Sequence, residues 1–450
     1  MKVTKIEIKN FKCFEETNLD NLSEKFNLFI GDNGEGKTAI LDALASALDS
    51  FISTFETESG LNNTTLHEDW VRRVTRQLGE ETKVELQYPF SVKCYGMIVD
   101  KEISWERLIK TQGKNGKKND VESARQLKLI RDKGNNVSLP LVAYYGNNRL
   151  WKRDDSKSND KKAQNQDDRF IGYKNSLNAG RSITQLINWL SEQFQEEIKN
   201  NQPSPTLTVV KQAIADCLDE WNKLDYKPGE SSEGVVAVSS TGQMLPLHLL
   251  SDGYRNILTI VADMAYRVAL LNPHFGENAA KETSGIVLID EIDLHLHPNW
   301  QERVIEDLSK TFPNIQFFAT THAPIIIQSL HKGKLIKIKA QIIDAHDEDE
   351  DDYEYIPTDA YRDQSPEDIL EDVMDQEMPQ RSKRYREMLE VSKEYYDTLE
   401  KAKKAKKGKH TETLNKLKDH LDELSVRYGD NPAYYGFLEY RRKVEKIDEE

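Results

Sequence analysis

An eight-residue loop, GDNGEGKT at residues 31–38, constrains the fold more than any other feature of this 450-residue chain. It matches G-x-x-x-x-G-K-[ST] in full and joins an apolar stretch, FNLFI, to a helix-like stretch, AILDALASAL. In such loops the backbone amides surround nucleotide phosphates, a lysine neutralises them and a hydroxyl binds Mg²⁺. A glycine turn could match by chance, but the motif and its context agree. The sequence therefore predicts an α/β fold that binds ATP and Mg²⁺.

The expected ATP contacts within this loop are Gly31, Asp32, Asn33, Gly34, Glu35, Gly36, Lys37 and Thr38. Lys37 would neutralise the β- and γ-phosphates, and Thr38 would bind Mg²⁺ through its hydroxyl. Further along, the apolar run at residues 286–289 predicts a strand buried on both faces. It ends on Asp290, an expected Mg²⁺ ligand, and Glu291, the expected catalytic base that deprotonates the attacking water.

A later apolar stretch, IQFFATTH, ends on His322. A lone histidine is usually packed or exposed. Its position at a strand end, after the strand that carries Asp290, favours a catalytic contact with the γ-phosphate. His295 and His297 lie between the two stretches, in DLHLHP. They have no third ligand nearby, so we expect a loop shaped by its proline rather than a metal site.

A second candidate phosphate-binding turn, LSDGYR at residues 250–255, lies far from the first. It opens a helix with an apolar stripe, and an open helix N-terminus attracts phosphate. Ser251 and Gly253 are its expected ATP contacts. Taken alone, the turn would be a helix cap, with Ser251 or Asp252 as the N-cap residue.

Composition narrows the class of protein. The formal net charge of -15 argues against general wrapping of nucleic acid, although a local basic face could exist. Cys13, Cys94 and Cys217 form no CxxC pair, which predicts reduced thiols in the cytoplasm without a disulfide framework or zinc site. We see no apolar run of signal-peptide or membrane-spanning length, so no membrane partner is expected.

The order of the motifs, GxxxxGKT, LSDGYR, LIDEID and TTH, resembles the ABC-type ATPase heads of the RecF and SMC group. The resemblance implies a head-to-tail dimer in which the signature turn of one subunit caps the ATP bound by another. Ser251 and Gly253 would then face the γ-phosphate held by Lys37 of the partner subunit. The usual signature is LSGGQ-like, whereas Asp252 and Tyr254 stand here in place of a glycine and the glutamine. Gln87 is the candidate for the glutamine of the family's Q-loop.

The chain is also similar to Septu-type PtuA ATPases of anti-phage systems, including versions attached to retrons. The similar stretches are residues 144–151, 250–267, 290–301 and 429–442. The resemblance implies ATP-dependent assembly above the dimer level and control of a separate HNH-type nuclease. In retron versions a reverse transcriptase and its RNA–DNA product would be further partners.

These motifs suggest two regions. Residues 1–340 are expected to form an ABC-type (RecF/SMC-like) P-loop ATPase head, with an exposed insertion at about 106–137 and a loop and helical subdomain at about 152–230. Residues 341–450 are expected to form an acidic linker and a charged C-terminal helical region that binds the partner. Its tail, residues 428–450, combines a helix-start signal with aromatic and arginine residues, which favours a docking helix over one packed on its own head.

Three alternatives stay open. An OLD-type nuclease-ATPase would need the acidic metal ligands of a TOPRIM domain. Asp347, Glu348 and Asp349 match the residue types of that motif, but the sequence after them predicts no series of buried strands. A RecF-like DNA-repair ATPase would bind DNA directly, through the lysine run at residues 401–409. A non-hydrolysing scaffold is contradicted only by Glu291.

Overall fold

The computed structural model describes residues 1–55, 68–78, 81–98, 101–111, 117–118, 122–132, 136–147, 169–179, 183–229, 234–339, 352–376, 383–404 and 411–425. The chain divides into two compact units, Met1–Ile369 and Leu370–Glu450.

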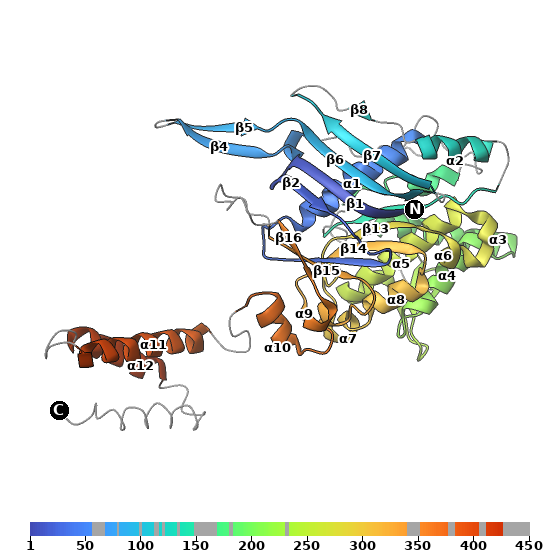
Figure 1. The fold of residues 1–450 in the computed structure, drawn as a ribbon. Helices are drawn as coiled ribbons and strands as arrows, with labels where there is room; N and C mark the ends of the chain where they lie inside the picture. Colours follow the sequence, from blue (N-terminus) through green and yellow to red (C-terminus); the bar gives the residue numbers. More distant parts are fainter. Residues whose placement is uncertain are drawn as a thin grey trace. The chain divides into compact units, whose positions relative to one another are not determined.

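A six-stranded sheet in the order β16-β15-β3-β14-β13-β9 lies at the centre of the first unit (Figure 1). Its strands are β3 (Phe26–Ile30), β9 (Leu141–Tyr145), β13 (Gly285–Ile289), β14 (Ile315–Thr320), β15 (Lys334–Ile338) and β16 (Tyr353–Ile356). Neighbouring strands run parallel except for β16, which is antiparallel to β15. All residues of β3, β9, β13 and β14 are buried, because helices cover both faces of the sheet. The expected α/β fold with buried parallel strands is confirmed.

The direction of the chain decides which helices cover which face. From β3 the chain passes to β9 at the sheet edge, and it then returns through β13 to β14. Because parallel crossovers are right-handed, these opposite directions place the connecting helices on opposite faces. The helix α1 (Lys37–Ile52) therefore lies on one face, with α3, α4, α5 and α8 on the other (Figure 1). These four helices are α3 (Ile183–Asn200), α4 (Pro205–Cys217), α5 (Asp252–Leu271) and α8 (Val304–Thr311).

A second, antiparallel sheet covers the other side of α1, in the order β2-β1-β6-β7-β8. Its strands are β1 (Lys2–Phe11), β2 (Phe14–Leu19), β6 (Phe90–Ile98), β7 (Lys101–Ile109) and β8 (Lys117–Lys118). Burial alternates along β6, as in a sheet with one covered face. Lying between two sheets, α1 is buried almost all round. The segment Lys37–Phe55 is long and apolar enough to cross a membrane by composition, but 78% of that apolar window is buried inside the protein.

Smaller elements complete the first unit. A two-stranded ribbon consists of β4 (Arg73–Leu78) and β5 (Glu81–Leu86), and a three-stranded sheet consists of β10 (Lys223–Tyr226), β11 (Val235–Val238) and β12 (Met244–Pro246). The short helices are α2 (Glu122–Asp132), α6 (Ala279–Glu282), α7 (Pro298–Gln301), α9 (Pro324–Gln328) and α10 (Pro366–Asp368). The strands β11 and β12 pair antiparallel as a hairpin around Gly242.

Two boundaries differ from the expected ones. The compact unit continues to Ile369 rather than ending at residue 340, since β16 pairs with β15 and so returns the chain to the central sheet. The segment expected as an exposed insertion contains the end of β7 and the helix α2, in which Ala124 and Leu127 are buried. Residues 148–168, most of the expected polar loop, lie outside the described part of the chain.

The second unit contains a pair of helices, α11 (Lys383–Lys404) and α12 (Thr411–Ser425). A small apolar core holds them together, consisting of Met388, Val391, Tyr395, Leu421 and Leu424, with Leu414 and Leu417 packed against it. The expected tail helix, the acidic run around Asp347 and the end of the lysine run lie outside the described residues.

Candidate nucleotide site

The loop between β3 and α1 depends on its glycines. Gly31, Gly34 and Gly36 have φ values of 143°, 95° and 96°, which residues with a side chain rarely adopt. A Cβ on Gly36 would also come within 2.7 Å of the Cys13 Sγ atom. Position 36 therefore has no room for a side chain, and the loop keeps its backbone open toward a phosphate.

The side chain of Lys37 turns back into this loop. Its Nζ atom donates to the carbonyl oxygens of Gly31 and Asp32, at 2.7 Å each. Burial lowers the pKa of the Lys37 ammonium, and the carboxylates of Glu35 and Asp32 oppose that shift. The hydrogen bonds hold the ammonium at the centre of the loop, where the β- and γ-phosphates are expected.

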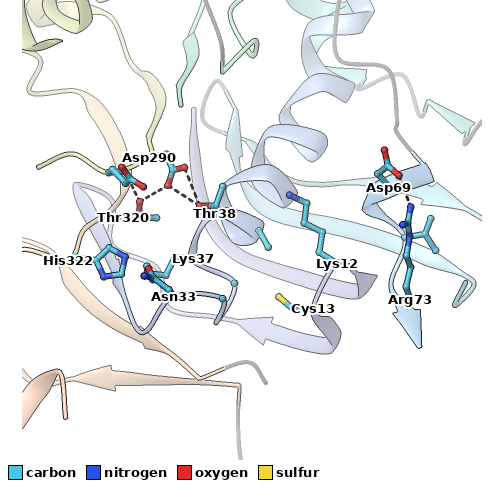
Figure 2. Close-up of a pocket in the computed structure, with 15 residues that line it drawn as sticks. Lys12, Cys13, Asn33, Lys37, Thr38, Asp69, Arg73, Asp290, Thr320 and His322 are labelled. Carbon is cyan, nitrogen blue, oxygen red and sulfur yellow. Dashed lines mark hydrogen bonds and ion pairs between the residues drawn. The ribbon is translucent and has the colours of Figure 1, made fainter. Parts of the chain in front are cut away.

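The carboxylate of Asp290 joins the loop to the central sheet (Figure 2). Asp290 follows β13 and is 2% exposed. The Thr38 hydroxyl donates to its two oxygens at 3.2 and 3.1 Å, and the Thr320 hydroxyl at the end of β14 donates to Oδ1 at 2.7 Å. Thr38 and Asp290 thus present a hydroxyl and a carboxylate oxygen at one place, the ligand types that Mg²⁺ prefers.

Glu291 has a constrained backbone. Its φ is 48°, in the left-handed region, and its N–H donates to the Thr320 hydroxyl at 2.8 Å. Such a conformation persists where the surroundings hold it, often at functional sites. The Glu291 side chain lines the same cavity as Thr38 and Asp290. A carboxylate placed there can accept a proton from a water molecule next to the phosphates.

His322 lines the cavity on the opposite side of Lys37 from Thr38 (Figure 2). Burial lowers the pKa of its imidazole, and the positive charge of Lys37 lowers it further. The imidazole is therefore neutral at neutral pH, with one nitrogen able to donate a hydrogen bond to a phosphate oxygen and the other able to accept one.

The cavity has a volume of about 670 Å³ and extends well beyond the phosphate loop. Its far part is lined by Lys12, Cys13, Asp69 and Arg73, none of which the sequence motifs indicate (Figure 2). Val71 also lines the cavity. Asp69 and Arg73 form an ion pair at 2.5 Å. Burial raises the pKa of the Cys13 thiol to about 11, so this thiol is neutral. This end leaves room for the nucleoside of a nucleotide whose phosphates lie at Lys37.

Lys12 and Thr320 are cavity residues whose role no sequence pattern indicates, because only the fold brings them to the site. Lys12 reaches the cavity because the turn from β1 to β2 takes up a left-handed conformation, with φ of 49° at Lys12. Its ammonium pairs with Asp42 on α1. Thr320 follows from sheet order, because β14 lies between β3 and β13, so its end lies between Thr38 and Asp290.

The signature turn does not line this cavity. Ser251 is exposed and caps α5, its hydroxyl accepting from the Tyr254 N–H at 3.5 Å. A Cβ on Gly253 would meet the His295 carbonyl oxygen at 2.5 Å, and Asn256 donates to the Leu294 carbonyl at 2.8 Å. The turn is therefore packed against the loop that follows Glu291, with Ser251 facing outward.

Gln87, the candidate for the Q-loop, is not among the residues that line the cavity. It follows β5 and donates through Nε2 to the Glu85 carbonyl at 3.4 Å. The strand end beside Asp290 is instead that of β9, where the Asp290 N–H donates to the Tyr145 carbonyl at 2.8 Å. In the DLHLHP loop, His297 accepts from the Asn299 N–H at 3.4 Å and caps α7, so the loop is shaped as expected.

The chain is similar to a known protein family and to several known proteins. A family described as an AAA domain matches residues 5–222. Two curated relatives are the retron Vc95 probable ATPase of Vibrio cholerae serotype O1 biovar El Tor, 25% identical, and the retron Ec83 probable ATPase of Escherichia coli, 27% identical. These alignments cover 73% and 75% of this chain and 72% of each relative.

Two further proteins are similar over much of the chain. The Septu protein PtuA of Bacillus mycoides is 25% identical over 74% of this chain, a match that spans 40% of the Bacillus protein. Among solved structures, the SMC head domain from Thermotoga maritima aligns with 79% of this chain and 99% of its own, at 17% identity and a TM-score of 0.39.

The hydroxyl of Thr320 provides the first test of the site. Thr320→Val keeps the shape of the side chain but removes the bonds to Asp290 Oδ1 and from the Glu291 N–H. We expect the rate of nucleotide hydrolysis at saturating Mg²⁺ and ATP to fall about 10- to 100-fold, as when a supporting partner of a metal ligand is lost. Thr320→Ser keeps the hydroxyl and should retain most of the rate. A valine variant with the wild-type rate would show that these bonds do not position the site.

Proposed function

Because this chain is a P-loop ATPase related to the retron ATPases and the Septu PtuA proteins, we propose that it is the ATP-hydrolysing subunit of an anti-phage defence complex in the cytoplasm. In this proposal ATP binding assembles the chain and regulates a separate, PtuB-like HNH nuclease. The arrangement of Thr38, Asp290 and Glu291 around one cavity is the observation that carries the catalytic part.

The residues have separate roles in hydrolysis. The glycine loop and Lys37 hold the triphosphate, and Thr38 with Asp290 would hold the Mg²⁺, which neutralises charge developing on the phosphates. Glu291 orients the attacking water and takes its proton, and Thr320 fixes Asp290 and Glu291 relative to each other. His322 contacts the γ-phosphate, so that its position depends on whether that phosphate is present.

We further propose that each ATP site is completed by a second copy of the chain. Ser251 is exposed at the N-terminus of α5 and lies outside the cavity of its own subunit. A helix N-terminus with an exposed hydroxyl fits the γ-phosphate of a nucleotide bound elsewhere. Head-to-tail pairing would bring Ser251 and Gly253 of one copy to the open face of the other copy's cavity.

The nuclease, and in retron versions the reverse transcriptase with its RNA–DNA product, come into this proposal through the defence-system relatives. For the docking element we propose the tail at residues 428–450, which combines aromatic side chains with arginines. Protein interfaces favour these residue types.

Glu291 tests the catalytic assignment directly. Glu291→Gln keeps the size of the side chain but cannot accept the proton from water. We expect ATP binding, measured with a fluorescent ATP analogue, to persist while the turnover rate falls roughly 100-fold or more. Wild-type turnover in this variant would remove Glu291 from the mechanism, and lost nucleotide binding would assign it a structural role instead.

Mixing two inactive variants tests the shared site. A Lys37→Ala chain cannot hold the phosphates and a Ser251→Arg chain cannot offer its turn, yet a mixed dimer has one intact site. Randomly mixed chains should regain roughly a quarter of the wild-type ATPase rate, because half of the dimers are mixed and each has one good site.

The matched control is a chain that carries both substitutions, mixed with the Lys37→Ala parent. Every site in that mixture lacks Lys37, so no activity should return. If the two single variants together never exceed the sum of the parents, the sites are not shared.

A truncated chain tests the nuclease partner. A chain that ends at Arg427 should hydrolyse ATP but fail to co-purify with an HNH nuclease encoded beside it. A full-length chain with Tyr434→Ala and Arg441→Ala serves as the second variant, in case the truncation affects folding. The docking proposal fails if both variants still capture the nuclease.

A further inference from the structure

The ribbon formed by β4 and β5 has two open edges. It extends from the first unit with only its own two strands side by side (Figure 1). Among the described residues, neither strand pairs with a third one. A two-stranded ribbon is marginal in water, and an open strand edge is a template for another strand. Val84, in the middle of β5, is 57% exposed.

The direction of the backbone groups along β5 follows from one hydrogen bond. The Gln87 N–H donates toward β4, to the Arg72 carbonyl, at 2.9 Å. Backbone groups alternate in direction along a strand, so those of Glu85 and Lys83 also point toward β4. The N–H and C=O groups of Thr82, Val84 and Leu86 therefore point to the open edge.

This edge is complementary to itself. When two copies of β5 meet antiparallel with Val84 opposite Val84 of the second copy, Thr82 lies opposite Leu86. The outward groups of all three residues then find partners, giving roughly six backbone hydrogen bonds between the copies. In the same register Lys83 lies opposite Glu85 of the second copy, and Glu85 opposite Lys83.

The charges of β5 favour this self-register over pairing with an unrelated strand. A lysine on an edge strand ordinarily discourages pairing. Here the self-register places an opposite charge across from each of Lys83 and Glu85, and cross-strand pairs of opposite charge stabilise a sheet. Their present contacts are surface ones, Lys83 with Glu85 at 3.5 Å and Arg76 with Glu85 at 3.6 Å. Surface ion pairs of this kind contribute little to stability, so Lys83 and Glu85 can give them up for contacts with a second copy.

We propose that β5 is a self-association edge, through which two copies of this chain form a continuous four-stranded sheet in the order β4-β5-β5-β4. The pairing is two-fold symmetric, so both copies use the same surface. The contact involves neither the phosphate loop nor the signature turn, and it is therefore separate from the head-to-tail pairing proposed above. A chain with both contacts can assemble beyond a dimer.

Charge reversal tests the register, with sedimentation velocity of the full chain as the measurement. A Lys37→Ala background without nucleotide removes any contribution from ATP-dependent pairing. Glu85→Lys creates two like-charged pairs across the two-fold axis, and so does Lys83→Glu. Each single reversal should raise the dissociation constant of the pair roughly tenfold or more. The double variant, Lys83→Glu with Glu85→Lys, restores opposite charges in the same register and should restore association.

Glu102→Lys is the matched control. It makes the same charge change at an exposed position of β7, opposite Met97 of β6 and in a different sheet from β5, and should leave association unchanged. The proposal is overturned if the Lys37→Ala chain stays monomeric at tens of micromolar, or if the double reversal does no better than the single ones. The second result would mean that the charges act in some way other than across from each other.

A cross-link gives an independent measurement. Cα atoms of a directly opposite, hydrogen-bonded pair lie about 5.5 Å apart, within the range of a disulfide. Mild oxidation of a Val84→Cys chain should therefore yield a covalent dimer. In the same register Thr82→Cys would lie about 13 Å from its copy, four residues along the strand, and should not cross-link. Equal cross-linking of both variants would contradict the register.

Discussion

The buried carboxylate of Asp290 is the interaction on which the site depends. It is 2% exposed, and it accepts hydrogen bonds from Thr38 and Thr320. A buried charge is costly unless hydrogen bonds or a metal compensate it. The three residues come from β13, the start of α1 and β14, which meet only because β14 lies between β3 and β13 in the sheet. The order of the strands therefore fixes both the hydrogen bonds to Asp290 and the place where Thr38 and Asp290 would hold Mg²⁺. It also places Glu291, which is the next residue in the chain after Asp290.

The helix α5, which begins at the signature turn, is connected with the chain around Asp290 at two places. At its N-terminus, Gly253 packs on the His295 carbonyl and Asn256 donates to Leu294, in the loop that follows Glu291. Further along α5, Asp263 accepts from the Tyr145 hydroxyl at 2.7 Å and from Arg267 at 2.8 Å. Tyr145 is the residue whose carbonyl accepts the Asp290 N–H. Bonds within one subunit thus connect Asp290 with the turn that a second copy would use in the proposed head-to-tail pair.

Local patterns predict local structure well in this chain, and the rest needs the fold. Three features each follow from a few adjacent residues: the loop at residues 31–38, the buried run before Asp290 and the cap at Ser251. The structure has them as a loop, a strand and a helix cap, respectively. Lys12, Asp69 and Arg73 carry no such signal, because they reach the cavity through the β1–β2 turn and the root of the β4–β5 ribbon. The boundary predicted at residue 340 was wrong, because the acidic stretch after it suggests a linker. The chain rejoins the central sheet only beyond that stretch, where β16 pairs with β15.

The two parts of the β4–β5 ribbon have different surroundings: its base, where β4 begins, lines the cavity, and its outer edge is the proposed contact with a second copy. Arg73, where β4 begins, lines the cavity and pairs with Asp69, whereas Val84 lies opposite Thr75, two residues further along the ribbon. A nucleotide that orders Arg73 would fix the base of the ribbon and reduce the entropy lost when β5 pairs with a second copy. Nucleotide binding and edge pairing would then favour each other, and linkage requires the effect to be equal in both directions. Pairing through β5 should therefore raise the affinity for nucleotide by the same factor by which nucleotide raises pairing.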